Sequence, residues 1–244
     1  MTHWTGHMPS DRLEARRPTE DQTSRTARKL YFISGSPPCW TVMLALTVKG
    51  LAYEAKRLNN AKREQKAPGF LVINPRGQVP VLVEGDFVVC ETHAILAYLD
   101  ATHAAPPLFG QSALETARIW QAIGECEHAL KGPVGDISRP LFRGKAEESA
   151  VQIAQAAEKV RAELALYEAR LAFAPFLAGR TLSAADLVVY PVLMQLGRAA
   201  AREQAQGFDL AWPLSDNLPN VARWAARIEA LPGYADAYPP HWKE

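Results

Sequence analysis

The chain has 244 residues, of which 48% are hydrophobic and 22% charged, a composition typical of a soluble globular protein with one large or two ordinary domains. Its net charge is +1, and its longest apolar runs are far too short to span a bilayer, so we expect neither nucleic acid nor a membrane as a partner. The 3 cysteines are few and widely spaced, which favours a reducing, cytoplasmic location over a disulfide framework.

The N-terminal 28 residues are polar and mix arginines with acidic side chains. They contain no apolar core of a secretory signal, and their acidic residues argue against an organelle transit peptide. We expect residues 1–28 to form a disordered tail, because polar termini of this kind fray.

Residues 29–103 alternate between strand and helix patterns. The expected strands are Leu30–Ile33, Tyr53–Leu58, Val81–Val83 and Phe87–Val89. Helical spacing follows the first strand from Val42, recurs briefly at Phe70, and returns over Thr92–Ala101. The order β-α-β-α-β-β-α makes the first two strands parallel and the last two an antiparallel hairpin, so a mixed four-stranded sheet is predicted.

A proline-containing linker over residues 104–111 separates this domain from an all-helical one at 112–240. The expected helices are Leu114–Leu130, Ala146–Leu171, Ala184–Arg202 and Leu218–Leu231, with Gly132-Pro133 among the separators. Ser183 precedes Asp186 by three residues, which is the spacing of a helix capping box. We interpret this pair as folding chemistry rather than as a catalytic serine and acid.

Ser36 lies at a predicted strand-to-helix turn, just before Pro38. A hydroxyl there can donate to a thiolate, and the free N–H groups of a helix start favour negative charge in the same place. The alternative is that Ser36 merely caps the helix. Cys39 follows three residues later, but no second cysteine precedes it, so we expect a buried apolar thiol and not a redox pair. Ser34 is a weaker competitor for the hydroxyl role.

Val79-Pro80 opens a predicted strand, where a backbone edge is free to pair with an extended peptide. Glu91-Thr92 starts the next helix and offers a carboxylate to an ammonium group, and a hydroxyl with backbone N–H groups to a carboxylate. The alternative for Thr92 is a simple cap. A small peptide with a free amine, a free carboxylate and a thiol satisfies all three segments, and glutathione is such a molecule.

The remaining polar residues point to no other chemistry. His93, His103 and His128 have no metal-ligand spacing with a cysteine or with one another, so no metal is expected. Glu125, Glu127 and His128 lie on a predicted helix, and we expect them on a solvated face.

Together these segments resemble the soluble glutathione S-transferase superfamily over about residues 29–240. Residues 74–82, Asn-Pro-Arg-Gly-Gln-Val-Pro-Val-Leu, resemble its Asn-Pro-x-Gly-Gln-Val-Pro-x-Leu signature, and residues 91–95 resemble its Glu-Ser-x-Ala-Ile motif. The resemblance implies a thioredoxin-like glutathione-binding domain followed by a helical domain that forms the electrophile site. It also implies a serine-type enzyme of the theta, phi or zeta kind, with Ser36 as the activating residue and glutathione as co-substrate. The implied glutathione contacts are Lys66, Gln78, Val79, Pro80, Glu91 and Thr92.

Our first hypothesis is therefore a cytoplasmic detoxifying transferase, a homodimer as relatives typically are, in which bound glutathione attacks a small hydrophobic electrophile. We expect an apolar cleft between the domains, walled by Trp120 and the Leu114–Leu141 region. The same machinery serves a glutathione-dependent isomerase or reductive dehalogenase equally well. A non-catalytic binding module on the same fold is the third possibility.

Overall fold

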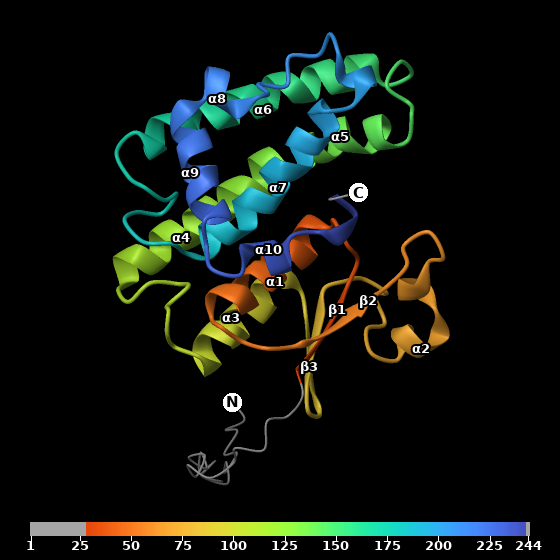
Figure 1. Ribbon diagram of the computed structural model, residues 1–244, viewed down its shortest axis with the longest axis vertical. Coiled ribbons are helices and arrows are strands. Elements are labelled where there is room, and N and C mark those ends of the chain that lie inside the picture. The colour runs from red at the N-terminus through yellow and green to blue at the C-terminus, as the bar shows by residue number, and fades with distance from the viewer. Residues whose placement is uncertain (1–27, 243–244) are drawn as a thin grey trace, which may run out of the picture.

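The computed structural model describes residues 28–242, and the expected N-terminal tail lies outside this range except for Arg28, which begins the first strand. The strands are β1 (Arg28–Phe32), β2 (Glu54–Arg57), β3 (Val81–Glu84) and β4 (Phe87–Cys90). The helices associated with them are α1 (Pro37–Val48), α2 (Pro68–Leu71) and α3 (Thr92–Thr102). Figure 1 shows this sheet and its helices beneath a larger group of helices.

The four strands form one sheet in the order β2-β1-β3-β4. β1 runs parallel to β2, with Leu30 opposite Ala55, and antiparallel to β3, with Leu30 opposite Leu82. β3 and β4 form the antiparallel hairpin. The predicted mixed sheet is thus confirmed, with Leu30 and Leu82 fully buried at its centre.

Helix α1 lies in the interior and joins the two parts of the molecule. Every residue from Cys39 to Leu46 is buried, so the helix presents no polar face to solvent over this stretch. It contacts α3 of the sheet domain on one side, and α7 and α10 of the helical part on the other. Ser36, at its start, is therefore held between the two parts.

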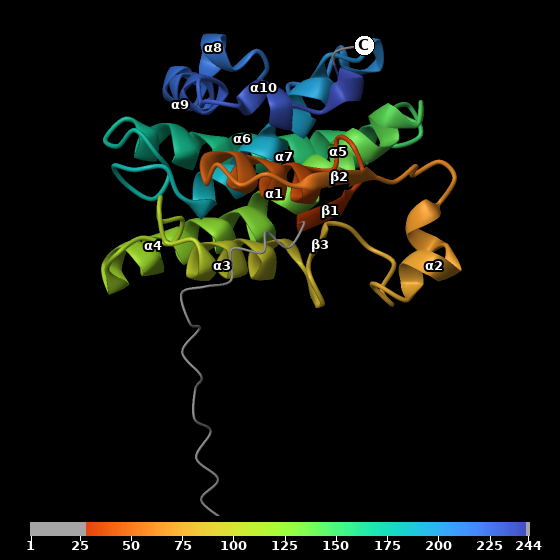
Figure 2. The ribbon, with the colours of Figure 1, turned by 60° about the horizontal axis from the view of Figure 1, so that its bottom comes forward.

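The rest of the described chain is helical. Its helices are α4 (Ala113–Glu125), α5 (Lys131–Phe142), α6 (Ala150–Leu171), α7 (Ala184–Ala200), α8 (Leu214–Asn217), α9 (Pro219–Glu229) and α10 (Tyr234–Ala237). Figure 2 shows α3 and α4 in one layer, α1, α5, α6 and α7 in the next, and α8 to α10 in a third. Within residues 28–242, no helix combines the length and the apolarity that crossing a membrane requires.

The prediction that Gly132-Pro133 separates two helices is wrong. α4 continues through a π-helical turn, Cys126–Leu130, directly into α5. Proline lacks an N–H group, and its ring crowds the carbonyl group four residues earlier. The wider turn just before Pro133 shifts the hydrogen-bond ladder, which lets the proline enter without ending the helix.

The capping box at the start of α7 is confirmed as a structural feature. The Asp186 carboxylate is fully buried and accepts hydrogen bonds from the Ser183 N–H and hydroxyl groups, both at 2.9 Å. It also accepts from the Leu177 N–H at 2.9 Å and from Trp224 Nε1 at 2.8 Å. One side chain thus ties the start of α7 to the preceding loop and to α9.

Candidate functional site

A cavity of about 550 Å³ lies where the turn before β3 meets the start of α3 and the segment around α2. It brings together all the residues that the sequence proposes as glutathione contacts. These are Lys66, Gln78, Val79, Pro80, Glu91 and Thr92. Residues from three separate segments therefore converge on one cavity, which makes it the candidate binding site.

Val79 supplies the free backbone edge in this cavity. Its bond to Pro80 is cis, and within residues 28–242 neither its N–H nor its C=O group has a hydrogen-bond partner. Buried Asn74 stabilises this turn, because its Nδ2 donates to the Gln78 carbonyl oxygen at 2.8 Å. One N–H and one C=O group are thus available to an extended peptide.

Gly77 allows the α2 segment to approach this turn. Its φ is +58°, and a Cβ atom there would lie 2.7 Å from the Gln65 carbonyl oxygen and 2.7 Å from the Lys66 side chain. Only glycine fits such a position without displacing backbone. The glycine of the signature therefore has a structural cause, because it lets Gln65 and Lys66 form a wall of the same cavity.

Gln65 and Lys66 are fixed differently. Lys66 Nζ donates to the Arg76 carbonyl oxygen at 2.8 Å, and Gln65 Nε2 donates to Asn60 at 2.9 Å. Gln65 Oε1, in contrast, is buried and has no partner in the described part of the chain. A buried acceptor without a donor is costly, so this atom is suited to receive an N–H group from a ligand.

The start of α3 combines a strained residue with a helix N-terminus. Glu91 precedes the helix at φ 70° and ψ 124°, a region that residues with side chains rarely adopt, and Thr92 is the first helical residue. Strain of this kind tends to collect at binding sites. The first N–H groups of α3 favour an anion, while the Glu91 carboxylate favours a cation.

Ser36 immediately precedes α1 but does not line the cavity, although Ile33 and Pro38 on either side of it do. Its hydroxyl makes no capping hydrogen bond to α1, so the simple cap expected as an alternative is not formed. Burial raises the pKa of the Cys39 thiol to about 11, and a hydrogen bond with the Ser36 side chain opposes this rise. Cys39 is accordingly a buried thiol, as predicted, and the Ser36 hydroxyl pairs with this side chain and does not cap the backbone of α1.

Comparison with known proteins identifies this arrangement. A family model of the glutathione S-transferase N-terminal domain matches residues 30–107, and the C-terminal domain model of the same family matches residues 150–227. Glutathione S-transferase A of Pleuronectes platessa is 30% identical over 223 residues, covering 88% of this chain and 92% of that protein. The chain belongs to the soluble glutathione transferase superfamily.

Solved structures agree with this assignment. A glutathione S-transferase from the Antarctic clam Laternula elliptica has a TM-score of 0.76 at 30% identity and covers 89% of this chain and 94% of its own. A glutathione S-transferase-I bound to lactoylglutathione has a TM-score of 0.72 at 28% identity and covers 86% and 98%. The predicted family and fold are thus confirmed, and glutathione transfer is the activity of this family.

The helical part of the transferase adds two charged residues that the sequence did not place here. A cavity of about 130 Å³ adjoins the first and shares Glu91, Thr92 and Lys131 with it. Lys131 Nζ donates to both carboxylate oxygens of Glu127, at 2.9 and 2.6 Å. Glu127 therefore lines the site, and the prediction that it lies on a solvated face is wrong.

His93 completes this group. Its Nε2 lies 3.6 Å from Glu127 Oε1, and burial lowers the pKa of His93 while the Glu127 charge raises it. No local sequence pattern indicates this contact, because only the packing of the two parts brings α3 and the π-helical turn together. Trp120 lines neither cavity: it stacks on Phe109 with ring centroids 4.9 Å apart and packs edge-on against His93 at 6.2 Å.

The described residues of the transferase contain no group of three or more His, Cys, Asp or Glu side chains able to hold a metal ion. Cys39, Cys90 and Cys126 are all free thiols. Burial raises the pKa of Cys126 to about 12 and, to a smaller extent, that of Cys90 beside the cavity. None of the three is thus electrostatically prepared to act as a nucleophile.

Proposed function

We propose that this transferase activates glutathione through the Ser36 hydroxyl for attack on a small electrophile with an apolar reacting end. The observation that carries the proposal is the shared cavity, in which the unpaired Val79 backbone lies beside Lys66, Gln78 and the Glu91-Thr92 helix start. The glutathione carboxylate and amine groups match the helix start and Glu91, and the peptide backbone matches Val79.

In the proposed reaction the thiol first loses its proton to solvent, and the thiolate accepts a hydrogen bond from Ser36. A carbon–sulfur bond then forms at the electrophilic carbon while the leaving group departs with its bonding electrons. The protein supplies positioning and charge stabilisation and forms no covalent bond itself. Because α1 begins with Pro37 and Pro38, which have no N–H group, its N-terminus offers the Cys39 N–H and the helix dipole to favour the thiolate together with Ser36.

The test is the thiolate absorbance of bound glutathione against pH, for the parent and for Ser36→Ala. We expect a pKa about one to two units below that of free glutathione in the parent, and a rise of about one unit in Ser36→Ala because one hydrogen bond to the charged form is lost. Ser36→Thr keeps a hydroxyl and should retain part of the depression.

Binding of S-methylglutathione, which has no thiol, is the control. It should be equally tight in the parent and in Ser36→Ala, since the variant changes only the environment of the sulfur. A parent in which glutathione binds with an unshifted pKa would favour the non-catalytic binding module. Release of unchanged glutathione after turnover would instead favour the isomerase.

We also propose that the transferase is a cytoplasmic homodimer. β4 exposes Phe87 and Val88, and the half-exposed Trp120 lies on α4, so apolar surface is present on both parts of the chain. Exposed apolar surface of this kind is typical of protein contacts. Light scattering should give twice the chain mass, and Phe87→Lys should reduce it, whereas Val72→Lys on the exposed α2 segment should not.

A further inference from the structure

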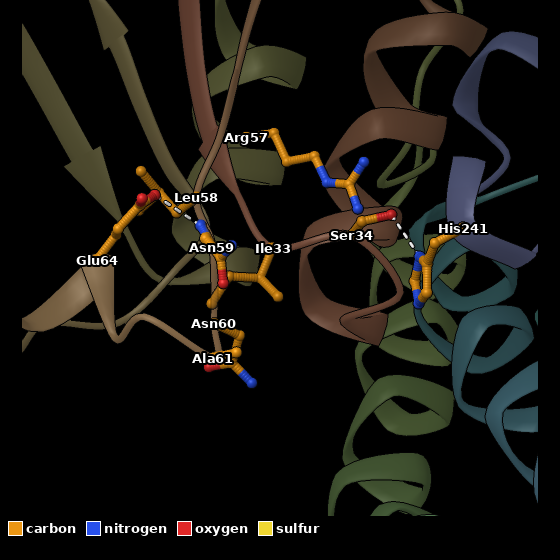
Figure 3. A pocket seen from close by; sticks show the side chains of 9 residues that line it. All are labelled: Ile33, Ser34, Arg57, Leu58, Asn59, Asn60, Ala61, Glu64 and His241. Atoms are coloured by element: carbon orange, nitrogen blue, oxygen red, sulfur yellow. Dashed lines mark hydrogen bonds between the residues drawn. The ribbon is translucent and has the colours of Figure 1, made fainter.

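A second cavity, of about 460 Å³, lies on the other side of Ile33 from the glutathione cavity. Figure 3 shows the side chains that line it, which come from the β1–α1 turn, from the end of β2 with the loop that follows, and from His241 near the C-terminus. Ile33 lines both cavities, so they are direct neighbours. Ser34 faces this one and is two residues from Ser36.

The C-terminal segment is fitted closely against this turn. Gly35 has a φ of +77°, and a Cβ atom on it would lie 2.5 Å from His241 Cε1 and 2.7 Å from Trp242 Nε1. The turn between Ser34 and Ser36 therefore accepts only glycine at its centre while His241 stays in place. The wall that His241 forms is thus a built part of the fold.

The hydrogen bonds of His241 determine the direction of the Ser34 hydroxyl. His241 Nε2 lies 2.9 Å from Arg198 Nη1, and His241 Nδ1 lies 2.7 Å from Ser34 Oγ. A guanidinium group can only donate, so Nε2 accepts and Nδ1 carries the proton. Ser34 Oγ consequently accepts from His241, and its own hydrogen has no acceptor among residues 28–242.

Arg57 brings an uncompensated positive charge to the same cavity. It ends β2, its side chain makes no ion pair or hydrogen bond within the described range, and its guanidinium is directed toward Ser34 in Figure 3. Arg198, behind His241, has no carboxylate partner there either, and it shares the Phe142 ring with Arg202. The Ser34 side of the cavity is therefore positively charged.

The opposite side of the cavity differs. Glu64 is the acidic residue in the lining, and Figure 3 shows its carboxylate on the far side from Ser34, where it accepts from the Asn59 N–H at 2.7 Å. An anionic group is thus repelled from that end and attracted to Arg57 and Ser34. A carboxylate can accept from both, and its contact with the guanidinium group is charge-assisted.

We propose that this cavity binds the carboxylate of the second substrate, so that the transferase prefers small electrophiles that carry an anionic group. The inference rests on the proposed function, because the glutathione thiolate that Ser36 stabilises must reach the electrophile past Ile33. Arg57 and the Ser34 hydroxyl hold the carboxylate, Arg198 keeps His241 in the tautomer that frees this hydroxyl, and the reacting end extends toward Ser36.

The test compares 4-chloro-3-nitrobenzoate with its methyl ester, each at saturating glutathione. Arg57→Gln should raise KM for the acid about tenfold and leave KM for the ester within about twofold, because one charge-assisted contact is lost. Ser34→Ala should produce a smaller effect of the same kind. Lys62→Gln removes an exposed positive charge from the same loop outside the cavity and is the matched control.

A second measurement does not depend on turnover. Binding of 3-nitrobenzoate and its methyl ester to the glutathione-loaded protein should weaken in Arg57→Gln for the acid alone. An equal loss for acid and ester, an acid that binds no better than its ester in the parent, or an acid that displaces glutathione would each overturn the inference. Ester turnover that still depends on Ser36 would leave the proposed function standing in all three cases.

Discussion

Glu91 holds a backbone conformation that ordinarily only glycine adopts, at the position where β4 passes into α3. Such a residue costs about 1–3 kcal/mol, and it persists only when its side chain is needed or its surroundings impose it. The next residue, Thr92, begins the helix whose free N–H groups line the cavity. The strained conformation therefore places the Glu91 carboxylate next to the helix N-terminus, which favours an anion. This pair suits a ligand that carries both an ammonium and a carboxylate group.

We predict that Glu91→Gly makes the protein more stable and the binding of glutathione weaker. Relief of the strained φ should outweigh the extra freedom of glycine in the unfolded chain, for a net gain of about 1 kcal/mol. Loss of the carboxylate should weaken glutathione about tenfold, because a charge-assisted hydrogen bond to the amine is lost. Urea unfolding and calorimetric titration measure the two effects.

Glu91→Gln separates the two causes. It keeps the strained backbone and the size of the side chain but removes the charge, so binding should weaken while stability stays near that of the parent. If Glu91→Gly were instead less stable than Glu91→Gln, the positive φ would not be a strained conformation in this turn.

At the scale of elements, the alternation of strand and helix patterns was sufficient to predict the sheet. Leu30 and Leu82 lie where periodicity places them, at the centre of the sheet. The prediction that Gly132-Pro133 separates two helices is wrong, because the π-helical turn that joins α4 to α5 is only five residues long and leaves no periodic signature in the sequence. Local pattern therefore predicts elements well and predicts their irregularities poorly.

The site divides in the same way. Its residues on the signature and at the start of α3 were predictable, since each is near a turn or helix end with a local sequence signal. Lys131 and His241 were not, because they reach their cavities only through the packing of α5 and of the C-terminal segment. The sequence separation of 207 residues between Ser34 and His241 is beyond any local pattern.

The start of α7 offers a prediction about a whole element. All four hydrogen-bonding partners of Asp186 are donors, so a carboxylate satisfies them and an amide cannot. Burial raises the pKa of Asp186, and these four donors oppose the rise. We predict that Asp186→Asn lowers the free energy of unfolding by about 3 kcal/mol, since an NH₂ group would face buried donors.

Urea unfolding followed by tryptophan fluorescence measures this change. Asp86→Asn, on the exposed turn of the β3–β4 hairpin, is the matched control and should alter stability by less than about 0.5 kcal/mol. An Asp186→Asn variant as stable as the parent would mean that the carboxyl group is protonated in the folded protein.

At the scale of the whole molecule, one continuous hydrophobic core runs through both parts of the chain. Trp40 of α1 is 1% exposed and lies at its centre. Its ring packs edge-on against Tyr190 of α7 at 5.4 Å, and against Trp242 at 5.2 Å near the C-terminus. A side chain of the sheet domain is thus enclosed by the helical part, which indicates that the two unfold together.

We predict that Trp40→Ala lowers the free energy of unfolding by about 3–5 kcal/mol, because a large cavity opens between the two parts. Calorimetry should still show a single endotherm, shifted to lower temperature, since the remaining core is shared. Trp40→Phe should cost clearly less. The indole N–H is buried and has no partner among the described residues, so phenylalanine removes an unsatisfied donor along with part of the ring.

Trp120→Ala is the control, because this indole is 43% exposed and packs against Phe109 and the edge of His93, outside the buried aromatic group around Trp40. It should shift the endotherm much less than Trp40→Ala. Two separated endotherms in Trp40→Ala would show that the Trp40 side chain alone couples the parts and that each can fold by itself. A single endotherm requires that the other contacts of α1, to α7 and α10, hold both parts in one cooperative unit. These contacts then also keep Ser34 and His241 together beside Ile33.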